Sequence, residues 1–199
     1  MKIYGDHRSG NCYKLKLVTS LLGISHQWVP IDILAGGTDT TGFESLNANK
    51  KIPVLELDDG RTLSESNAIL NFLARRSVLE PNSEFDQAKV QQWQFFEQYS
   101  HEPYIAVARF IAVYLNMPES RAQEFRDKQE GGHKALSVME KQLTRSDFLV
   151  GDQATTADVS LYAYTHVAEE GGFELSAYPG ICAWLDRIRA LPNYVAMAS

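Results

Sequence analysis

Short apolar runs and helical stripes alternate along the first part of the chain. The run Lys2–Tyr4 predicts a first strand, and apolar residues recurring every three to four positions predict a helix over residues 12–22. Gly23 is placed to end that helix. Alternating apolar residues predict a second strand over residues 27–33. Pro30 lies inside it and donates no backbone hydrogen bond, so we expect this strand at a sheet edge.

A polar stretch and a hairpin follow. Residues 34–49 predict an irregular loop with room for one helical turn. Residues 54–57 and 61–63 predict two strands, joined by a turn in which Asp59-Gly60 supplies positive backbone angles. Ser64 is a candidate N-cap for the next helix. The apolar residues expected on one face of that helix are Ile69, Phe72 and Leu73. A βαβ unit followed by a hairpin and a helix predicts a mixed sheet covered by helices.

The rest of the chain carries only helical patterns. The predicted helices cover residues 84–115, 119–144, 157–169 and 181–191. The apolar stripes that indicate them include Val90, Trp93, Phe96 and Tyr99 in the first helix, and Ala135, Met139 and Leu143 in the second. Pro103 is expected to kink or restart the first. We therefore predict an α/β domain over residues 1–77, a linker over 78–86 and an all-helical domain over 87–199.

Composition narrows the possible functions. The chain has 199 residues, 44% apolar and 22% charged, as in ordinary globular proteins. A formal net charge of −6 without a basic run argues against nucleic acid and anionic membrane surfaces as partners. No apolar run is long enough for a membrane span, and no signal-peptide pattern opens the chain, so a reducing cytoplasm is the expected location. The two cysteines and five histidines show no metal-binding spacing, so no metal is expected.

The segment Lys51-Ile52-Pro53-Val54 is the first candidate for chemistry. An X-Pro bond can be cis at low cost, and a cis bond here leaves the backbone N–H and C=O of Ile52 facing outward. Such an edge can pair with a peptide ligand as an extra strand. The alternative is an ordinary trans proline that starts a strand.

Two helix starts are further candidates. Glu65 and Ser66 open one helix, where free N–H groups bind a carboxylate, the Ser66 hydroxyl adds a donor and Glu65 can hold an ammonium group. Ser9 and Asn11 open the other, where neutral donors and the helix N-terminus can stabilise a thiolate and lower its pKa. Plain helix capping is the alternative at both places.

Taken together, these segments resemble the cytosolic glutathione transferases, over nearly the whole chain. The segments that carry the resemblance are Ser9 in a strand–turn–helix, Lys51-Ile52-Pro53-Val54-Leu55, Asp59-Gly60, Glu65-Ser66-Asn67-Ala68-Ile69, Gly151-Asp152-Gln153-Ala154-Thr155-Thr156-Ala157-Asp158, and Ala183-Trp184-Leu185-Asp186-Arg187-Ile188 with Pro192-Asn193-Tyr194. The resemblance implies a thioredoxin-like first domain followed by a helical bundle. It also implies that Thr155 and Asp158 form the capping box of a buried helix.

The resemblance assigns a role in binding glutathione, the co-substrate, to each matched position. Ile52, ahead of cis-Pro53, pairs its backbone with the cysteinyl part. Glu65 and Ser66 hold the γ-glutamyl end. The other implied contacts are Lys51 with the glycine carboxylate and Ser9, or alternatively Asn11, with the sulfur.

Three further residues bear on the mechanism. Tyr104 and Arg109 are weaker candidates for lining the second-substrate pocket, with core packing or surface pairing as the alternative. Cys12 stands where the resolving cysteine of a thioredoxin-type CxxC motif lies, but Ser9 replaces the attacking cysteine, so we interpret Cys12 as packed.

The implied activity is conjugation of reduced glutathione to small hydrophobic electrophiles, a detoxification reaction, by a homodimer. The first alternative is a glutathione-dependent disulfide or peroxide reductase. The second is a non-catalytic interaction module built on the same fold.

Overall fold

The computed structural model describes residues 1–197, which form two compact units. The first comprises Met1–Ser77 together with the chain from Leu191 onward, and the second is Val78–Ala190. The two units therefore divide after Ser77. Helix α4 begins at Glu84, inside the stretch 78–86 that was predicted as a linker.

The residues from Leu191 onward differ from the prediction, which assigned them to the helical domain. They group with the first unit because side chains of its first helix hold their backbone carbonyls. The Tyr13 hydroxyl donates to the Val195 carbonyl at 2.8 Å, and Lys16 donates to the carbonyls of Ala196 and Met197 at 3.0 and 3.1 Å. These contacts depend on tertiary structure, so the sequence pattern could not reveal them.

The first unit is built on a four-stranded mixed sheet of order β2-β1-β3-β4. Its strands are β1 (Lys2–Gly5), β2 (Gln27–Pro30), β3 (Val54–Glu56) and β4 (Thr62–Leu63). β1 pairs parallel with β2 and antiparallel with β3, which pairs antiparallel with β4. Strand β2 lies at the edge, as Pro30 predicts, but it ends at that proline. Asp32 then accepts hydrogen bonds from the N–H groups of Leu34 and Ala35 and turns the chain.

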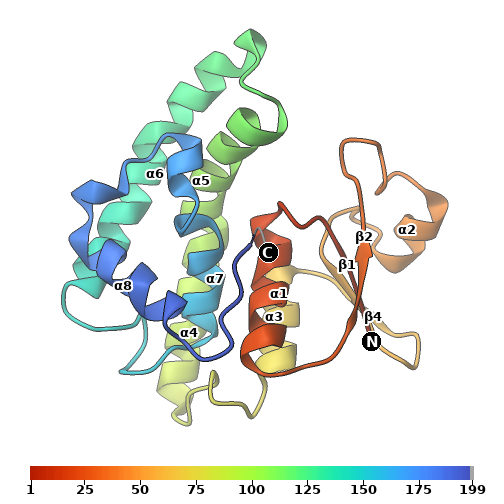
Figure 1. Ribbon diagram of the computed structural model, residues 1–199, viewed down its shortest axis with the longest axis horizontal. Coiled ribbons are helices and arrows are strands. Elements are labelled where there is room, and N and C mark those ends of the chain that lie inside the picture. The colour runs from red at the N-terminus through yellow and green to blue at the C-terminus, as the bar shows by residue number, and fades with distance from the viewer. Residues whose placement is uncertain (198–199) are drawn as a thin grey trace. The chain divides into compact units, whose positions relative to one another are not determined.

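Three helices complete this unit: α1 (Gly10–Leu21), α2 (Thr41–Leu46) and α3 (Ser66–Ala74). Helices α1 and α3 pack side by side (Figure 1). Gly23, at φ 64°, ends α1 with two hydrogen bonds characteristic of a Schellman motif, Gly23 N–H to Ser20 C=O and Ile24 N–H to Thr19 C=O. The fully buried apolar side chains of the unit include Ile3, Leu15, Leu17, Val18, Val54, Leu55, Ile69 and Leu70.

Three local predictions in this unit were wrong. Ser64 is not the N-cap of α3; Glu65 occupies that position at φ 68°, without a side-chain capping bond. Phe72 is 50% exposed rather than part of the buried face, which consists of Ser66, Ile69, Leu70 and Ala74. In the hairpin turn only Gly60, at φ 83°, takes a positive φ, and Asp59 does not.

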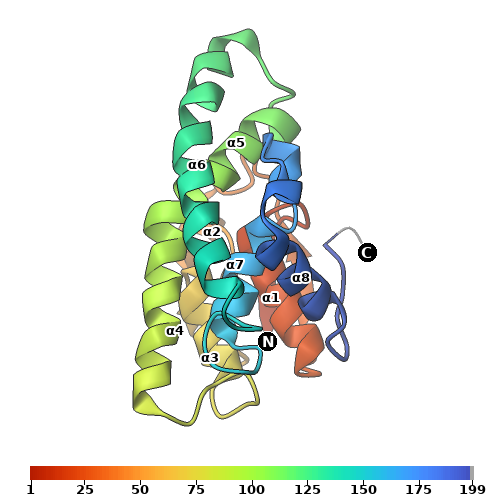
Figure 2. The same cartoon turned by 90° about the vertical axis from the view of Figure 1, so that its left-hand side faces the viewer.

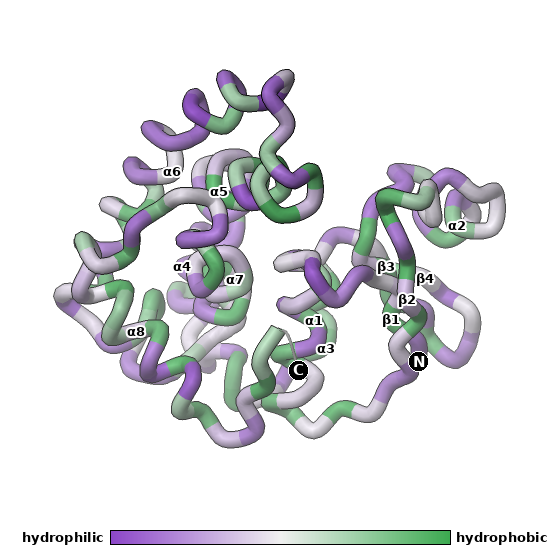
Figure 3. Tube along the Cα trace, turned by 45° about the horizontal axis from the view of Figure 1, so that its top comes forward, coloured by the Kyte–Doolittle hydropathy of each residue, from purple (hydrophilic) through white to green (hydrophobic). Residues whose placement is uncertain are grey.

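The second unit is all-helical within the described residues (Figure 2). Its α-helices are α4 (Glu84–Phe96), α5 (Glu102–Arg109), α6 (Ala122–Leu143), α7 (Thr156–Thr165) and α8 (Pro179–Arg189). Short 3₁₀ turns cover Glu119–Arg121, Ala168–Gly171 and Leu175–Ala177. Helix α6 carries hydrophilic residues along much of its length (Figure 3) and buries one stripe that includes Ala135, Met139 and Leu143, as predicted.

Two π-helical segments, Glu97–His101 and Phe110–Tyr114, flank α5. The first changes the helical register just before Pro103, which lies in the first turn of α5. As a result Tyr99 is 87% exposed, and its predicted place in the apolar stripe was wrong. Glu97 and His101 take the buried positions instead.

Helix α7 is buried along its whole length and begins with the predicted capping box. Asp158 accepts hydrogen bonds from the N–H groups of Leu149 and Thr155 at 2.9 and 2.8 Å and from the Trp184 indole at 2.9 Å. This carboxylate therefore joins the loop before α7 to helix α8.

Candidate functional site

Two of the predicted motifs lie at one end of the sheet in the first unit. The register pairs Tyr4 with Val54, so the start of β3 lies beside the end of β1, where the chain leads to Ser9. The Ile52–Pro53 peptide bond is cis, as the resemblance implies. Within residues 1–197, neither the N–H nor the C=O of Ile52 has a backbone partner. That strand-like edge is therefore available for pairing with an extended ligand.

Asn47 fixes the approach to this edge. Its side chain is 8% exposed, and its Nδ2 donates to the Lys51 carbonyl at 2.8 Å. Lys51 itself is exposed, and Lys50 forms an ion pair with Glu44 at 3.2 Å. The sequence did not single out Asn47, because an asparagine in a polar loop gives no signal before the loop is folded.

Ser9 is the N-cap of α1, and its hydroxyl oxygen accepts a hydrogen bond from the Cys12 N–H at 3.4 Å. This is the capping role that the sequence left as the alternative. Capping uses an acceptor site of the hydroxyl and leaves its proton able to donate to an anion. The two interpretations of Ser9 are therefore compatible.

The start of α3 meets the first turns of α1. Ser66 is 6% exposed, and its hydroxyl donates to the amide oxygen of Asn11 at 3.1 Å. The Lys14 ammonium donates to the same hydroxyl oxygen at 3.2 Å. Glu65 is exposed beside them. The hydroxyl proton is therefore used by Asn11, and what suits this place to a carboxylate is the helix start with a buried positive charge behind it.

Lys14 was not among the predicted site residues. The signal was present, because Lys14 is one turn before Val18 on the apolar stripe of α1, where a charged residue is out of place. Its side chain is fully buried.

Cys12 is fully buried, as predicted, and burial raises the pKa of its thiol to about 12. A Cβ at Gly5 would lie 2.7 Å from its sulfur, so the thiol fills a close contact between β1 and α1. Cys12 is therefore a packing residue and a poor nucleophile at neutral pH.

Tyr104 and Arg109 both have partners within the helical unit. The Arg109 side chain is 6% exposed and pairs with Glu170 at 2.6 Å. The Tyr104 ring lies under Lys128 at 5.7 Å and packs where a Cβ at Gly131 would clash. These contacts match the packing alternative, and a role in the second-substrate pocket stays a prediction.

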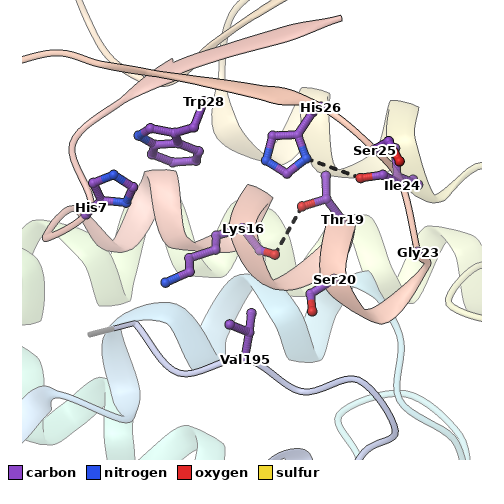
Figure 4. A pocket seen from close by; sticks show the side chains of 10 residues that line it. All are labelled: His7, Lys16, Thr19, Ser20, Gly23, Ile24, Ser25, His26, Trp28 and Val195. Carbon is purple, nitrogen blue, oxygen red and sulfur yellow. Dashed lines mark hydrogen bonds between the residues drawn. The ribbon is translucent and has the colours of Figure 1, made fainter. Parts of the chain in front are cut away.

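A pocket of about 420 Å³ lies elsewhere in the first unit (Figure 4). Its lining residues come from α1, β2, the neighbouring loops and the C-terminal segment: His7, Lys16, Thr19, Ser20, Gly23, Ile24, Ser25, His26, Trp28 and Val195. None of the predicted site residues is among them. The His7 ring stacks on Trp28 with centroids 4.8 Å apart. The pocket is thus separate from the candidate site.

Two other kinds of site are absent from residues 1–197. Among these residues, no group of three or more histidine, cysteine, aspartate or glutamate side chains is arranged to hold a metal ion. No helix in the same range is both long and apolar enough to cross a bilayer.

The fold and the candidate site define a class: a thioredoxin-like domain with a ligand-binding edge, followed by an all-helical domain. Residues 8–76 match the family model for the glutathione S-transferase N-terminal domain, and residues 102–192 match that for the C-terminal domain. The chain belongs to the glutathione S-transferase family, and both the predicted family and the predicted fold are confirmed.

Similar proteins come from bacteria and plants. A crystal structure of a glutathione S-transferase from Pseudomonas fluorescens is 57% identical, with a TM-score of 0.98 over 100% of this chain and 98% of the other. Glutathione S-transferase F13 of Arabidopsis thaliana is 26% identical, covering 100% of this chain and 94% of its own. Maleylacetoacetate isomerase of Pseudomonas aeruginosa is 25% identical, covering 98% and 93%.

Proposed function

We propose that this protein is a glutathione transferase that conjugates reduced glutathione to small hydrophobic electrophiles. The observation that carries the proposal is the convergence of matched motifs in one unit, with the strand-like edge of Ile52 beside the end of β1 and Ser66 in contact with α1. Glutathione has a peptide backbone for the Ile52 edge, a zwitterionic glutamyl end for the start of α3, and a thiol for the start of α1.

Each of the three residues of glutathione has its own contact in the proposed site. The backbone of Ile52 pairs with the cysteinyl residue, and the start of α3 receives the γ-glutamyl α-carboxylate. Glu65, exposed at that helix start, accepts from the glutamyl ammonium group. Lys51, also exposed, contacts the glycine carboxylate.

The Ser9 hydroxyl then donates a hydrogen bond to the glutathione sulfur. This bond favours the thiolate over the thiol and lowers the thiol pKa towards neutral. The thiolate attacks an electrophilic carbon, a carbon–sulfur bond forms, and the leaving group departs with the electron pair of its bond. No protein base is needed, since the proton is released to solvent when the thiol ionises.

Several finer expectations belong to the same proposal. The protein acts as a homodimer, in a reducing cytoplasm that keeps glutathione in its thiol form, and serves detoxification. Tyr104 and Arg109 remain weaker candidates for the second-substrate pocket. No metal takes part in the mechanism.

The alternatives differ in the acceptor. A disulfide or peroxide reductase uses the same glutathione site, but the burial of Cys12 removes the protein thiol that a CxxC-type mechanism needs. The isomerase relative is named for maleylacetoacetate, so cis-to-trans isomerisation of a maleyl compound joins the reactions worth assaying. A non-catalytic interaction module has no use for an intact glutathione site.

The test is calorimetric titration of the purified protein with reduced glutathione at neutral pH. We expect saturable binding that weakens in Glu65→Ala and Ser66→Ala, and turnover of 1-chloro-2,4-dinitrobenzene with release of chloride. Asn49→Ala, at an exposed loop residue, serves as the control. A folded protein that does not bind glutathione refutes the proposal and revives the interaction module. Binding with turnover only of a glutathione mixed disulfide favours the reductase.

A further inference from the structure

Lys14 is a buried cation next to the proposed glutamyl site. Its side chain is fully buried, so it cannot touch a ligand directly. Its Nζ lies 3.2 Å from the hydroxyl oxygen of Ser66, the first residue of α3. Burying an ammonium group is costly unless a nearby negative or polar group repays the lost hydration. The bond to Ser66 is one such contact, and it places the positive charge beside the start of α3.

The hydrogen bond from Lys14 determines how the Ser66 hydroxyl can act. Because the oxygen accepts from Lys14, its proton points away, and it donates to the amide oxygen of Asn11 at 3.1 Å. The hydroxyl is thus held in one orientation by α1. This fixes the first residue of α3 before any ligand arrives.

The positive charge of Lys14 also lies close enough to attract a carboxylate bound at the start of α3. A carboxylate at the start of α3, one hydrogen bond from Ser66, is at most ~6 Å from the Lys14 ammonium. At that distance, in a partly dehydrated site, the attraction is worth on the order of tenfold or more in affinity. It adds to the field of the helix N-terminus, which has the same sign.

We propose that Lys14 is a positioning residue: its hydrogen bond holds Ser66 in place, and its charge favours a ligand with a carboxylate at the start of α3. The proposal rests on the proposed function, because it takes the γ-glutamyl α-carboxylate as the group selected. It adds a specificity determinant that no pattern in the sequence assigned.

The experiment compares two ligands: reduced glutathione, and the analogue in which only the γ-glutamyl α-carboxylate is replaced by a carboxamide. Dissociation constants are measured by calorimetry for the wild type, Lys14→Met and Lys14→Gln. Lys16→Met is the matched control, since it removes a lysine two residues further along α1 whose amine binds the carbonyls of Ala196 and Met197. The thermal midpoint of each protein is recorded as well.

We expect the wild type and Lys16→Met to prefer the acid over the amide by about tenfold or more. In Lys14→Met the preference falls to about twofold or less, because acid binding weakens while amide binding hardly changes. Lys14→Gln keeps a donor to Ser66 without the charge, and is also expected to lose the preference. The acid-over-amide preference of Lys14→Gln tests the proposal if Lys14→Met does not fold.

Equal weakening of both ligands in the Lys14 variants would show a merely structural role and overturn the proposal, as would an unchanged preference. If the wild type binds neither ligand, the glutathione site itself is refuted, and this inference falls with it. If the wild type binds glutathione, a negative result in the Lys14 variants refutes only the role of Lys14 and leaves the proposed glutathione site standing.

Discussion

The amide oxygen of Asn11 accepts a hydrogen bond from the hydroxyl of Ser66, 55 residues further along the chain, at 3.1 Å. This contact associates Asn11 with the start of α3, which is the proposed glutamyl site. Ser9, by contrast, caps α1 and keeps a proton that it can donate. The bond from Ser66 uses the amide oxygen of Asn11 and not its NH₂ donors, so Ser9 and Asn11 both stay candidates for the hydrogen bond to the glutathione sulfur.

The first prediction separates these two residues. In Ser9→Ala we expect the pKa of the bound thiol to rise and kcat to fall by about 10²-fold, with little change in glutathione affinity, because the lost bond acts on the thiolate. In Asn11→Ala we expect mainly weaker glutathione binding. Ultraviolet titration of the bound thiolate and steady-state kinetics measure both effects.

Ser83→Ala is the control for the capping role of Ser9. Ser83 caps α4 by accepting from the Asp86 N–H at 3.3 Å, in the other unit. Each variant should lose about 1 kcal/mol of stability, while only Ser9→Ala changes the thiol pKa. An unchanged thiol pKa in Ser9→Ala, with a raised one in Asn11→Ala, would reverse the assignment.

The second prediction concerns the loop that carries Ile52. Asn47→Ala removes the 2.8 Å hydrogen bond to the Lys51 carbonyl and frees the backbone before Ile52. We expect the KM for glutathione to rise about tenfold, with a smaller change in kcat, because the edge must be ordered when the ligand binds. Asn49→Ala, at an exposed position in the same loop, should leave the KM unchanged. Equal effects of the two substitutions would exclude a specific role for Asn47.

Much of the fold could be predicted from local patterns. Pro30 indicated an edge strand, Gly23 a helix end and Thr155 with Asp158 a capping box, because each acts on the backbone within a few residues. The prediction of Ser64 as the N-cap of α3 was wrong, because the backbone before this helix takes an unusual path. The chain reaches α3 through Glu65 in a positive-φ conformation that residue preferences do not suggest.

What could not be predicted depends on register or on distant contacts. The π-helical segment at Glu97–His101 shifts the buried face, so Tyr99 points outward although its spacing suits the stripe. The hydrogen bond between Lys14 and Ser66 joins helices α1 and α3 through two residues that are 52 positions apart in the sequence. Sequence could show that Lys14 is an anomaly on an apolar face, but not which group it meets.

The third prediction tests the expected homodimer. Three aromatic side chains on or next to α4 are largely exposed: Phe85 at 71%, Phe95 at 71% and Tyr99 at 87%. Exposed aromatic groups gathered on one helix are typical of protein interfaces. We expect the wild type to sediment as a dimer and Phe95→Asp to sediment as a monomer. Val138→Asp, at a 39% exposed position on α6, should remain a dimer. A wild-type monomer at micromolar concentration would contradict the expectation.

The fourth prediction is a pH dependence of stability. Burial lowers the pKa of His166 to about 4, while its ring stacks on Tyr162 with centroids 4.7 Å apart. The unfolded chain binds a proton at His166 at its ordinary pKa of 6.5, whereas the folded protein does not. Stability from this residue is therefore complete above pH 6.5 and is lost as the pH falls towards 4.

Urea unfolding between pH 7.5 and 5 measures this loss. We expect His166 to account for about 1–2 kcal/mol of it at pH 5. His166→Gln should flatten the dependence by that amount, even if the variant is less stable throughout. Parallel curves for His166→Gln and the wild type would contradict the assignment.

The last prediction concerns Asp158, which is fully buried and joins three parts of the helical unit. Its carboxylate accepts from the N–H groups of Leu149 and Thr155 and from the indole of Trp184. Asp158→Ala leaves these three donors buried without an acceptor, so we expect a loss of about 3–5 kcal/mol in the free energy of unfolding. In Asp158→Asn we expect a smaller loss in the free energy of unfolding, because the amide keeps one oxygen acceptor. Some loss remains, because the amide NH₂ group would face N–H donors.

Trp184→Phe makes the origin of the loss measurable. It removes one donor to Asp158 and keeps an aromatic ring in the core, so the double variant with Asp158→Ala should be less destabilised than the sum of the two single variants. Asp152→Ala, at an exposed position in the same loop, should change stability by less than about 0.5 kcal/mol. Additive effects of the two core substitutions would mean that the Asp158–Trp184 bond contributes little, and that the bonds from Leu149 and Thr155 explain the need for Asp158.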